Sequence, residues 1–159
     1  MTVENVARAL QGVYCNDQSD PTADAQDTFT DLVYNLPIVL DAAAGTDYTY
    51  ASFKAPFRFK VIDATICPGA ALTAADATAN TLTLAKADGA GGAATTIASI
   101  VTNLASGNWV ADTFKAMTLS ATAANLLVAD GQIVTLKKTH AGAGTVTPAS
   151  TLTLRIRKY

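Results

Sequence analysis

The sequence predicts an all-β protein, an antiparallel β-sandwich preceded by an acidic amino-terminal arm. Strict alternation of threonine and leucine occurs twice, at residues 81–84 and 151–154, with the period of a half-buried strand. Glycine-containing turns separate the alternating segments, and threonine and alanine are abundant. This composition favours pleated surfaces over flexible linkers.

Length and charge restrict the class of protein. A chain of 159 residues predicts one domain that is large enough to bury a core without metal or disulfide support. The net charge is −2 and the isoelectric point about 5.1, and no nucleic-acid motif accompanies the cations, so no nucleic-acid partner is expected. The sequence contains neither a run of ~20 apolar residues nor a signal-peptide pattern, which predicts no membrane partner and assembly in a cytoplasm.

Residues 1–45 differ from the rest and are interpreted as an arm, with the sandwich at 46–159. The start of the arm is compatible with a short amphipathic helix, because Thr2 is a suitable cap and Gly12 a stop. Its apolar residues near one face are Val3, Val6, Leu10 and Val13, and Tyr14 follows them. Residues 16–21, Asn-Asp-Gln-Ser-Asp-Pro, are rich in turn-forming residues, which indicates a loop or linker.

A series of aspartates follows at spacings of three and four residues: Asp17, Asp20, Asp24, Asp27 and Asp31. On a helix these like charges would share one face, at a cost of about a few tenths of a kcal/mol per pair. The segment is therefore either extended or placed against a basic surface. The last 23 residues, by contrast, carry five cations and no acid, and these oppositely charged segments either attract one another or are separately solvated.

The sandwich is expected to begin with two aromatic strands. In the first, Tyr48 and Tyr50 alternate with Thr49, and in the second Phe57, Phe59 and Val61 share a face. The alternation then changes phase near Val61 and Ile62, which predicts a β-bulge or a crossing between sheets. Residues 67–69, Cys-Pro-Gly, end this strand.

Five further strands are predicted at 80–87, 95–102, 114–119, 132–138 and 151–158. Their separators contain glycine, which reaches positive φ without steric cost. The stretch 72–78 is either a helical turn or a loop.

The chemistry-bearing residues form no catalytic arrangement, so the chain is expected not to be an enzyme. His140 is the only histidine and is predicted to lie on a glycine-rich surface loop, with no serine or cysteine brought toward it. Cys15 and Cys67 lack metal-ligand spacing and are expected to be reduced. No catalytic, cofactor-binding or metal-binding residue is predicted.

The aromatic residues are the remaining candidates for a binding site. The alternating positions of Tyr48, Tyr50, Phe53, Phe57 and Phe59 favour a sandwich core over a sugar-stacking face. Trp109 follows a turn, and both burial and exposure remain open for it.

The strands 57–66, 79–86, 127–136 and 151–156 together resemble small jelly-roll proteins of tailed-bacteriophage virions, especially capsid decoration or cement proteins. The resemblance spans residues 48–157, about two thirds of the chain. It implies a jelly-roll-like sandwich on the outside of a phage head, a major capsid protein as partner, a homotrimer, and an arm that reaches neighbouring capsid subunits.

The interface expected from this resemblance and from the arm comprises Val3, Val6, Leu10, Val13, Tyr14, Asp17, Asp20, Asp24, Asp27 and Asp31. A receptor-binding or carbohydrate-binding sandwich module is the alternative, and it should expose aromatic residues on one face. A hydrolase is a third class, and it would need a polar cluster that the sequence does not display.

Overall fold

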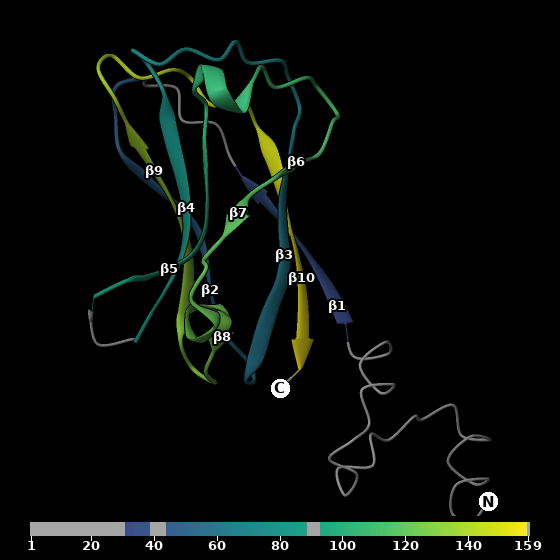
Figure 1. The fold of residues 1–159 in the computed structure, drawn as a ribbon. Coiled ribbons are helices and arrows are strands. Elements are labelled where there is room, and N and C mark those ends of the chain that lie inside the picture. Colours follow the sequence, from purple (N-terminus) through teal and green to yellow (C-terminus); the bar gives the residue numbers. More distant parts are fainter. Residues whose placement is uncertain (1–30, 39–43, 89–92, 159) are drawn as a thin grey trace, which may run out of the picture. The chain divides into compact units, whose positions relative to one another are not determined.

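The computed structural model describes residues 31–38, 44–88 and 93–158, which form two five-stranded antiparallel sheets (Figure 1). The first sheet has the order β1-β10-β3-β6, with β8 also paired to β3. Its strands are β1 (Asp31–Ile38), β3 (Phe59–Pro68), β6 (Lys115–Ala116), β8 (Leu127–Val128) and β10 (Ser150–Lys158). The second sheet, of order β2-β9-β4-β5-β7, contains β2 (Tyr48–Lys54), β4 (Asn80–Ala87), β5 (Thr95–Val101), β7 (Thr118–Leu119) and β9 (Ile133–His140).

The strand order is that of a jelly roll. The short strands β6, β7 and β8 belong to one segment, residues 115–128, and count as a single strand of the eight. When the eight strands are counted in chain order, the first sheet has the order 1-8-3-6 and the second sheet the order 2-7-4-5. The first strand therefore pairs with the eighth, the second with the seventh, the third with the sixth and the fourth with the fifth. This is the antiparallel double-sheet winding of two Greek keys. The predicted fold class is confirmed.

The core lies between the two sheets and follows the predicted alternation. Leu82 and Leu84 of β4, and Leu152, Leu154 and Ile156 of β10, are buried, while the threonines between them face outward and are only partly covered. Phe59 is buried at the start of β3, and Phe57 packs against it edge-on at 6.1 Å between ring centroids. The two Thr-Leu-Thr-Leu segments therefore lie in different sheets and face one another across the core.

The predicted phase change is a β-bulge in β3. Ile156 pairs with Val61 and Arg155 pairs with Asp63, so Ile62 has no partner in the ladder. The extra residue lets Val61 and Ala64 both point into the core although they are three positions apart.

The boundary between arm and sandwich must be corrected from residue 45 to near residue 31. β1 is hydrogen-bonded to β10 at the edge of the first sheet, and Tyr34 and Leu36 of β1 pack against the core. The ring of Tyr34 stacks on Phe53 of β2, with 6.3 Å between centroids and 7° between planes. The aspartates before this strand and Pro37 near its end had obscured the alternation of Leu32, Tyr34 and Leu36.

Other expected elements need smaller corrections. The predicted strand at 114–119 is divided into β6, which pairs with β3, and β7, which pairs with β5. Residues 72–78 form a loop that contains one isolated bridge, and the described helical turns are the short 3-10 segments η2 (Leu104–Ser106) and η3 (Ala123–Leu126). In the residues described, no helix is long and apolar enough to cross a membrane.

Candidate functional site

Three long connections lie together at one end of the sandwich and form its most distinctive surface (Figure 1). They are residues 69–79 between β3 and β4, 102–114 between β5 and β6, and 141–149 between β9 and β10. We call these three segments the loop platform. Loops carried by a rigid sandwich are common positions for binding residues.

The first two segments of the platform are joined by backbone hydrogen bonds. The Trp109 N–H donates to the Leu72 carbonyl at 2.9 Å, and the Leu72 N–H donates to the Trp109 carbonyl at 3.0 Å. The Ala74 N–H donates to Asn108 Oδ1 at 2.9 Å, and the Leu104 N–H donates to Asp76 Oδ1 at 3.0 Å. The two loops are therefore held in one arrangement by partners distant in sequence.

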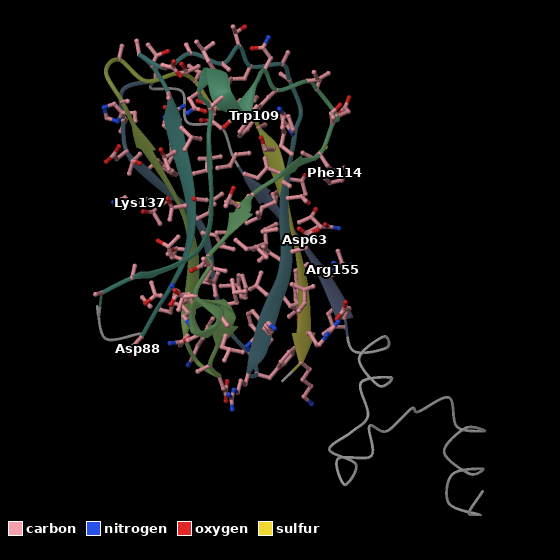
Figure 2. All side chains as sticks on the ribbon, in the orientation of Figure 1. Asp63, Asp88, Trp109, Phe114, Lys137 and Arg155 are labelled. Carbon is pink, nitrogen blue, oxygen red and sulfur yellow. The ribbon has the colours of Figure 1, made fainter. Side chains whose placement is uncertain are left out.

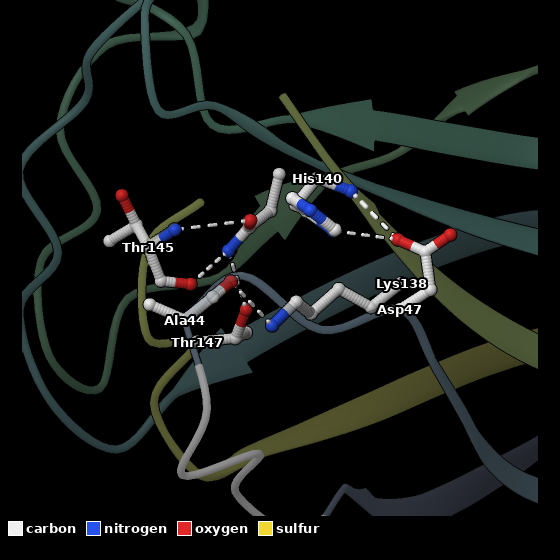
Figure 3. Close-up of polar contacts among 7 residues, drawn as sticks. Ala44, Asp47, Lys138, His140, Thr145 and Thr147 are labelled. Carbon is white, nitrogen blue, oxygen red and sulfur yellow. Dashed lines mark hydrogen bonds and ion pairs between the residues drawn. The ribbon is translucent and has the colours of Figure 1, made fainter. Parts of the chain in front are cut away.

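Asn80 connects the third segment to the others. Its side chain is fully buried, and its amide nitrogen donates to the Thr145 carbonyl and to Thr147 Oγ1, the latter at 3.1 Å. Its backbone N–H donates to Thr102 Oγ1 at 2.8 Å. Figure 3 shows Thr145 and Thr147 on the loop that this network holds in place. Such a satisfied buried network makes a unique loop conformation more stable.

Several polar side chains of the platform hydrogen-bond to neighbouring loop segments, and several large apolar side chains are exposed. The outward residues and their exposed fractions are Leu104 at 64%, Val110 at 58%, Phe114 at 62% and Val146 at 45%. Asp76 and Asp112 are the charged residues of the three segments, and none of the segments contains a lysine or arginine. In Figure 2, Trp109 and Phe114 lie toward this end and Asp88 lies at the other. Exposed apolar residues on rigid, nearly uncharged loops are typical of a protein-binding surface.

An apolar pocket of about 500 Å³ lies within the platform. It is lined by Gly69, Ala70, Ala71, Val146, Pro148 and Ala149. One wall of the pocket comes from the β3–β4 connection and the other from the β9–β10 connection. A hydrogen bond from the Gly69 N–H to the Ala149 carbonyl, at 2.7 Å, joins the two connections. The pocket has the size and the lining to receive an apolar side chain of a partner.

Beside the platform, Asp47 and His140 tie the start of β2 to the end of β9. His140 Nδ1 lies 2.8 Å from Asp47 Oδ1, and the His140 backbone N–H donates to the same oxygen at 3.2 Å (Figure 3). The hydrogen bond from His140 lowers the pKa of the Asp47 carboxyl below its usual value. The prediction for His140 was wrong in one respect, since this residue ends strand β9 rather than lying on the loop.

Lys138 is one of the five cations at the basic end of the sequence, yet it is buried in the folded protein. It is 0% exposed, and its ammonium donates to the Ala44 carbonyl at 3.4 Å (Figure 3). Val134, Leu136 and Lys138 lie on the inward face of β9. Because successive inward residues of a strand are two positions apart, the sequence position of Lys138 indicates its burial.

The predicted aromatic core is confirmed for Phe59, which is buried in the core, and for Phe53 and Phe57, which are partly buried and pack against it. Tyr48 is exposed, so its assignment to the core was wrong, and the Tyr50 side chain lies outside the described residues. A bulge at Ala51 shifts the register of β2 between Tyr48 and Phe53. Trp109, for which the sequence allows both burial and exposure, is 1% exposed and covers the core beneath the platform.

The predicted interface residues before Asp31 lie outside the described residues. Asp31 itself is half-buried at the first position of β1 and takes part in a polar contact. Within the described ranges, no three His, Cys, Asp or Glu side chains lie close enough to hold a metal ion.

Comparisons with known proteins identify no family for this chain. No protein family model matches it. No curated protein matches it either. Among solved structures, a chain of "Structure of infectious bursal disease virus Gx strain" is similar, with a TM-score of 0.40 and 16% identity. That match covers 80% of this chain and 32% of the other, so this chain spans about a third of its length.

Proposed function

We propose that this chain is a structural protein of a virion, and specifically a decoration or cement protein on the outside of a bacteriophage head. The observation that carries the proposal is the loop platform, where large apolar side chains are exposed and several polar side chains hydrogen-bond the loops to one another. A jelly roll alone is compatible with many activities. A prearranged, nearly uncharged docking surface supports an assembly function, because little ordering entropy is lost when it binds.

The proposed partner of the platform is the major capsid protein. Val110 and Phe114 would be buried against the outer surface of the shell, and the apolar pocket would accept a side chain from it. The opposite end, where Asp88 lies and where β2 ends at Lys54, would then face solvent. The amino-terminal arm would extend to adjacent capsid subunits and bring its aspartates to a basic surface.

Binding to heads tests the proposal. Purified chain is mixed with heads of the encoding phage assembled without it, and bound protein is measured by co-sedimentation and located by cryo-electron microscopy. We expect density on the head exterior and a higher temperature of head disruption. Heads that neither bind the chain nor carry it in the mature particle would overturn the proposal.

A matched pair of variants tests the platform. Val110 is 58% exposed on the platform and Val33 is 61% exposed on β1. We expect Val110→Ser to weaken head binding by about tenfold, because it removes apolar area from the buried contact, and Val33→Ser to leave binding unchanged. Equal effects of the two variants would show that another surface contacts the shell.

The same proposal includes a homotrimer assembled in the host cytoplasm. The apolar residues of the arm, Val3, Val6, Leu10, Val13 and Tyr14, would contact a neighbouring subunit or the shell. Analytical ultracentrifugation of the free protein and cryo-electron microscopy of the bound protein test this. A monomer in both states would contradict it.

A further inference from the structure

A polar groove opens where the two sheets separate beside η2. Strand β7 pairs with β5 through Ser99 and Thr118, but two residues earlier β6 pairs with β3 through Ala116 and Thr65. The chain thus leaves one sheet for the other, and the Met117 N–H donates to the Ala64 carbonyl at 2.8 Å between the two pairings. The divergence of β5 and β6 leaves a groove of about 430 Å³.

The lining of this groove is polar and contains one positive charge. It combines the hydroxyls of Ser99, Ser106 and Thr118, the carboxamide of Asn103 and the ammonium of Lys115, with no carboxylate. Its remaining residues are Ile100, Val101, Ala105 and Ala116. The groove therefore offers several neutral hydrogen-bonding groups around a single cation.

Three of these residues, Lys115, Asn103 and Ser106, are held in position by hydrogen bonds within the groove. Lys115 Nζ donates to the Ser106 carbonyl at 3.0 Å, which leaves two of its three N–H donors for a ligand. Asn103 Oδ1 accepts hydrogen bonds from the Ser106 N–H at 3.0 Å and from the Ser106 hydroxyl at 2.8 Å. Because Oδ1 faces Ser106, the amide nitrogen of Asn103 points away from Ser106. Gly107, with φ of 69°, leaves space beside the ammonium, since Lys115 Nζ would lie 3.9 Å from an added Cβ.

We propose that this groove binds an acidic sugar unit, a monosaccharide residue that carries a carboxylate and several hydroxyls. The carboxylate pairs with Lys115, and the sugar hydroxyls bond to Ser99, Ser106, Thr118 and the free amide of Asn103. A neutral sugar leaves the ammonium without a charged partner, and a simple anion leaves the hydroxyls unused. This inference does not depend on the proposed decoration function and has a separate test.

The test is a titration of the full-length, isotope-labelled chain followed by amide NMR shifts. The probes are glucuronate, glucose and acetate at neutral pH. We expect glucuronate to shift the amides of the groove and to bind more tightly than either of the others. Equal binding of acetate would show a simple anion site, and the absence of groove shifts with glucuronate would overturn the proposal.

Variants localise the binding. Lys115→Met should weaken glucuronate binding about fivefold or more, because charge-assisted hydrogen bonds are lost. Ser99→Ala, on β5 and away from the loop contacts of Lys115, should weaken it about twofold to tenfold. Lys54→Met is the control, since β2 is separated from β5 by β9 and β4. If Lys54→Met lost as much glucuronate affinity as Lys115→Met, the assignment of the site to this groove would be refuted.

Discussion

Leu72 and Trp109 exchange two backbone hydrogen bonds although neither residue belongs to a strand of either sheet. This bridge joins the β3–β4 and β5–β6 connections and places the indole of Trp109 over the end of the core. The indole Nε1–H is buried and no polar atom of the described residues lies within bonding distance. Trp109 therefore contributes its apolar surface, and its polar group contributes nothing favourable.

Substitution of Trp109 should separate these two contributions. Trp109→Ala should reduce the free energy of unfolding by about 3–5 kcal/mol, because it leaves a large cavity. Trp109→Phe should cost much less, since a ring still fills the site and the unpaired N–H is removed. Chemical denaturation followed by circular dichroism measures both. Equal losses would show that the N–H has a partner such as a bound water.

Asn80, the first residue of β4, should be the polar residue on which the platform loops depend most. Asn80→Ala leaves the Thr145 carbonyl and Thr147 Oγ1 without their buried donor, which should cost about 1–3 kcal/mol in unfolding free energy. The control is Asn35→Ala, because Asn35 Oδ1 accepts an exposed hydrogen bond from Thr153 Oγ1 at 2.9 Å. We expect the control to change stability by no more than about 0.5 kcal/mol. A small Asn80 effect would mean that the loops are held mainly by their backbone bonds.

The strands were predictable because the pattern that specifies each strand lies within its own stretch of sequence. In β4 and β10 two leucines alternate with two threonines, so a two-residue period specifies both the strand and its buried face. The bulge at Ile62 was predictable for the same reason, since it interrupts that period. β1 was missed because flanking aspartates and Pro37 outweighed three alternating apolar residues.

The platform was not predictable because its contacts join distant positions. Nothing near Leu72 indicates Trp109, and Asn80 meets Thr145 across 65 residues. The outward direction of Val110 and Phe114 depends on those contacts. Turn composition predicts that such segments are loops, but it does not predict which of their side chains the fold turns inward.

Gly144 should tolerate no side chain. It has φ of 66°, and an added Cβ would collide with the Ala44 backbone carbonyl. Gly144→Ala should therefore destabilise the protein by more than about 2 kcal/mol, through backbone strain and the displaced loop. Gly131→Ala is the matched control, because Gly131 has φ of 80° but its nearest neighbour would be the flexible end of Lys54 at 3.6 Å. Thermal unfolding of the two variants should give the larger loss of stability for Gly144→Ala, and the reverse order would contradict this packing of Gly144 against Ala44.

The Asp47–His140 contact should make stability depend on acid pH. The pKa of Asp47 is lowered from 3.8 in the folded protein, chiefly by the His140 hydrogen bond, so the folded state favours the carboxylate. The resulting stabilisation is present above pH 3.8 and is lost as the pH falls through the lower, folded-state pKa. Melting temperatures measured from pH 6 to pH 2 should fall less for Asp47→Asn than for the wild type. Identical profiles would show that the contact does not persist in solution.

Two truncations should distinguish the arm from the sandwich. Removal of residues 1–30 keeps β1 and should leave the melting temperature nearly unchanged. Removal of residues 1–45 also deletes Tyr34 and Leu36, which pack against the core, and leaves β10 as an unprotected edge. The longer truncation should lose at least about 2 kcal/mol of unfolding free energy and aggregate more readily.

The shorter truncation also tests the proposed action of the arm. If the aspartates before β1 meet a basic capsid surface, the 31–159 chain should bind heads more weakly than the full chain while remaining folded. Replacing Asp17, Asp20, Asp24 and Asp27 by asparagine should weaken binding chiefly at low salt, because charges are screened over ~10 Å at 0.1 M ionic strength. If the 31–159 chain binds heads as tightly as the full chain at every salt concentration, the arm takes no part in attachment. The sandwich and its loop platform would then account for all of the binding.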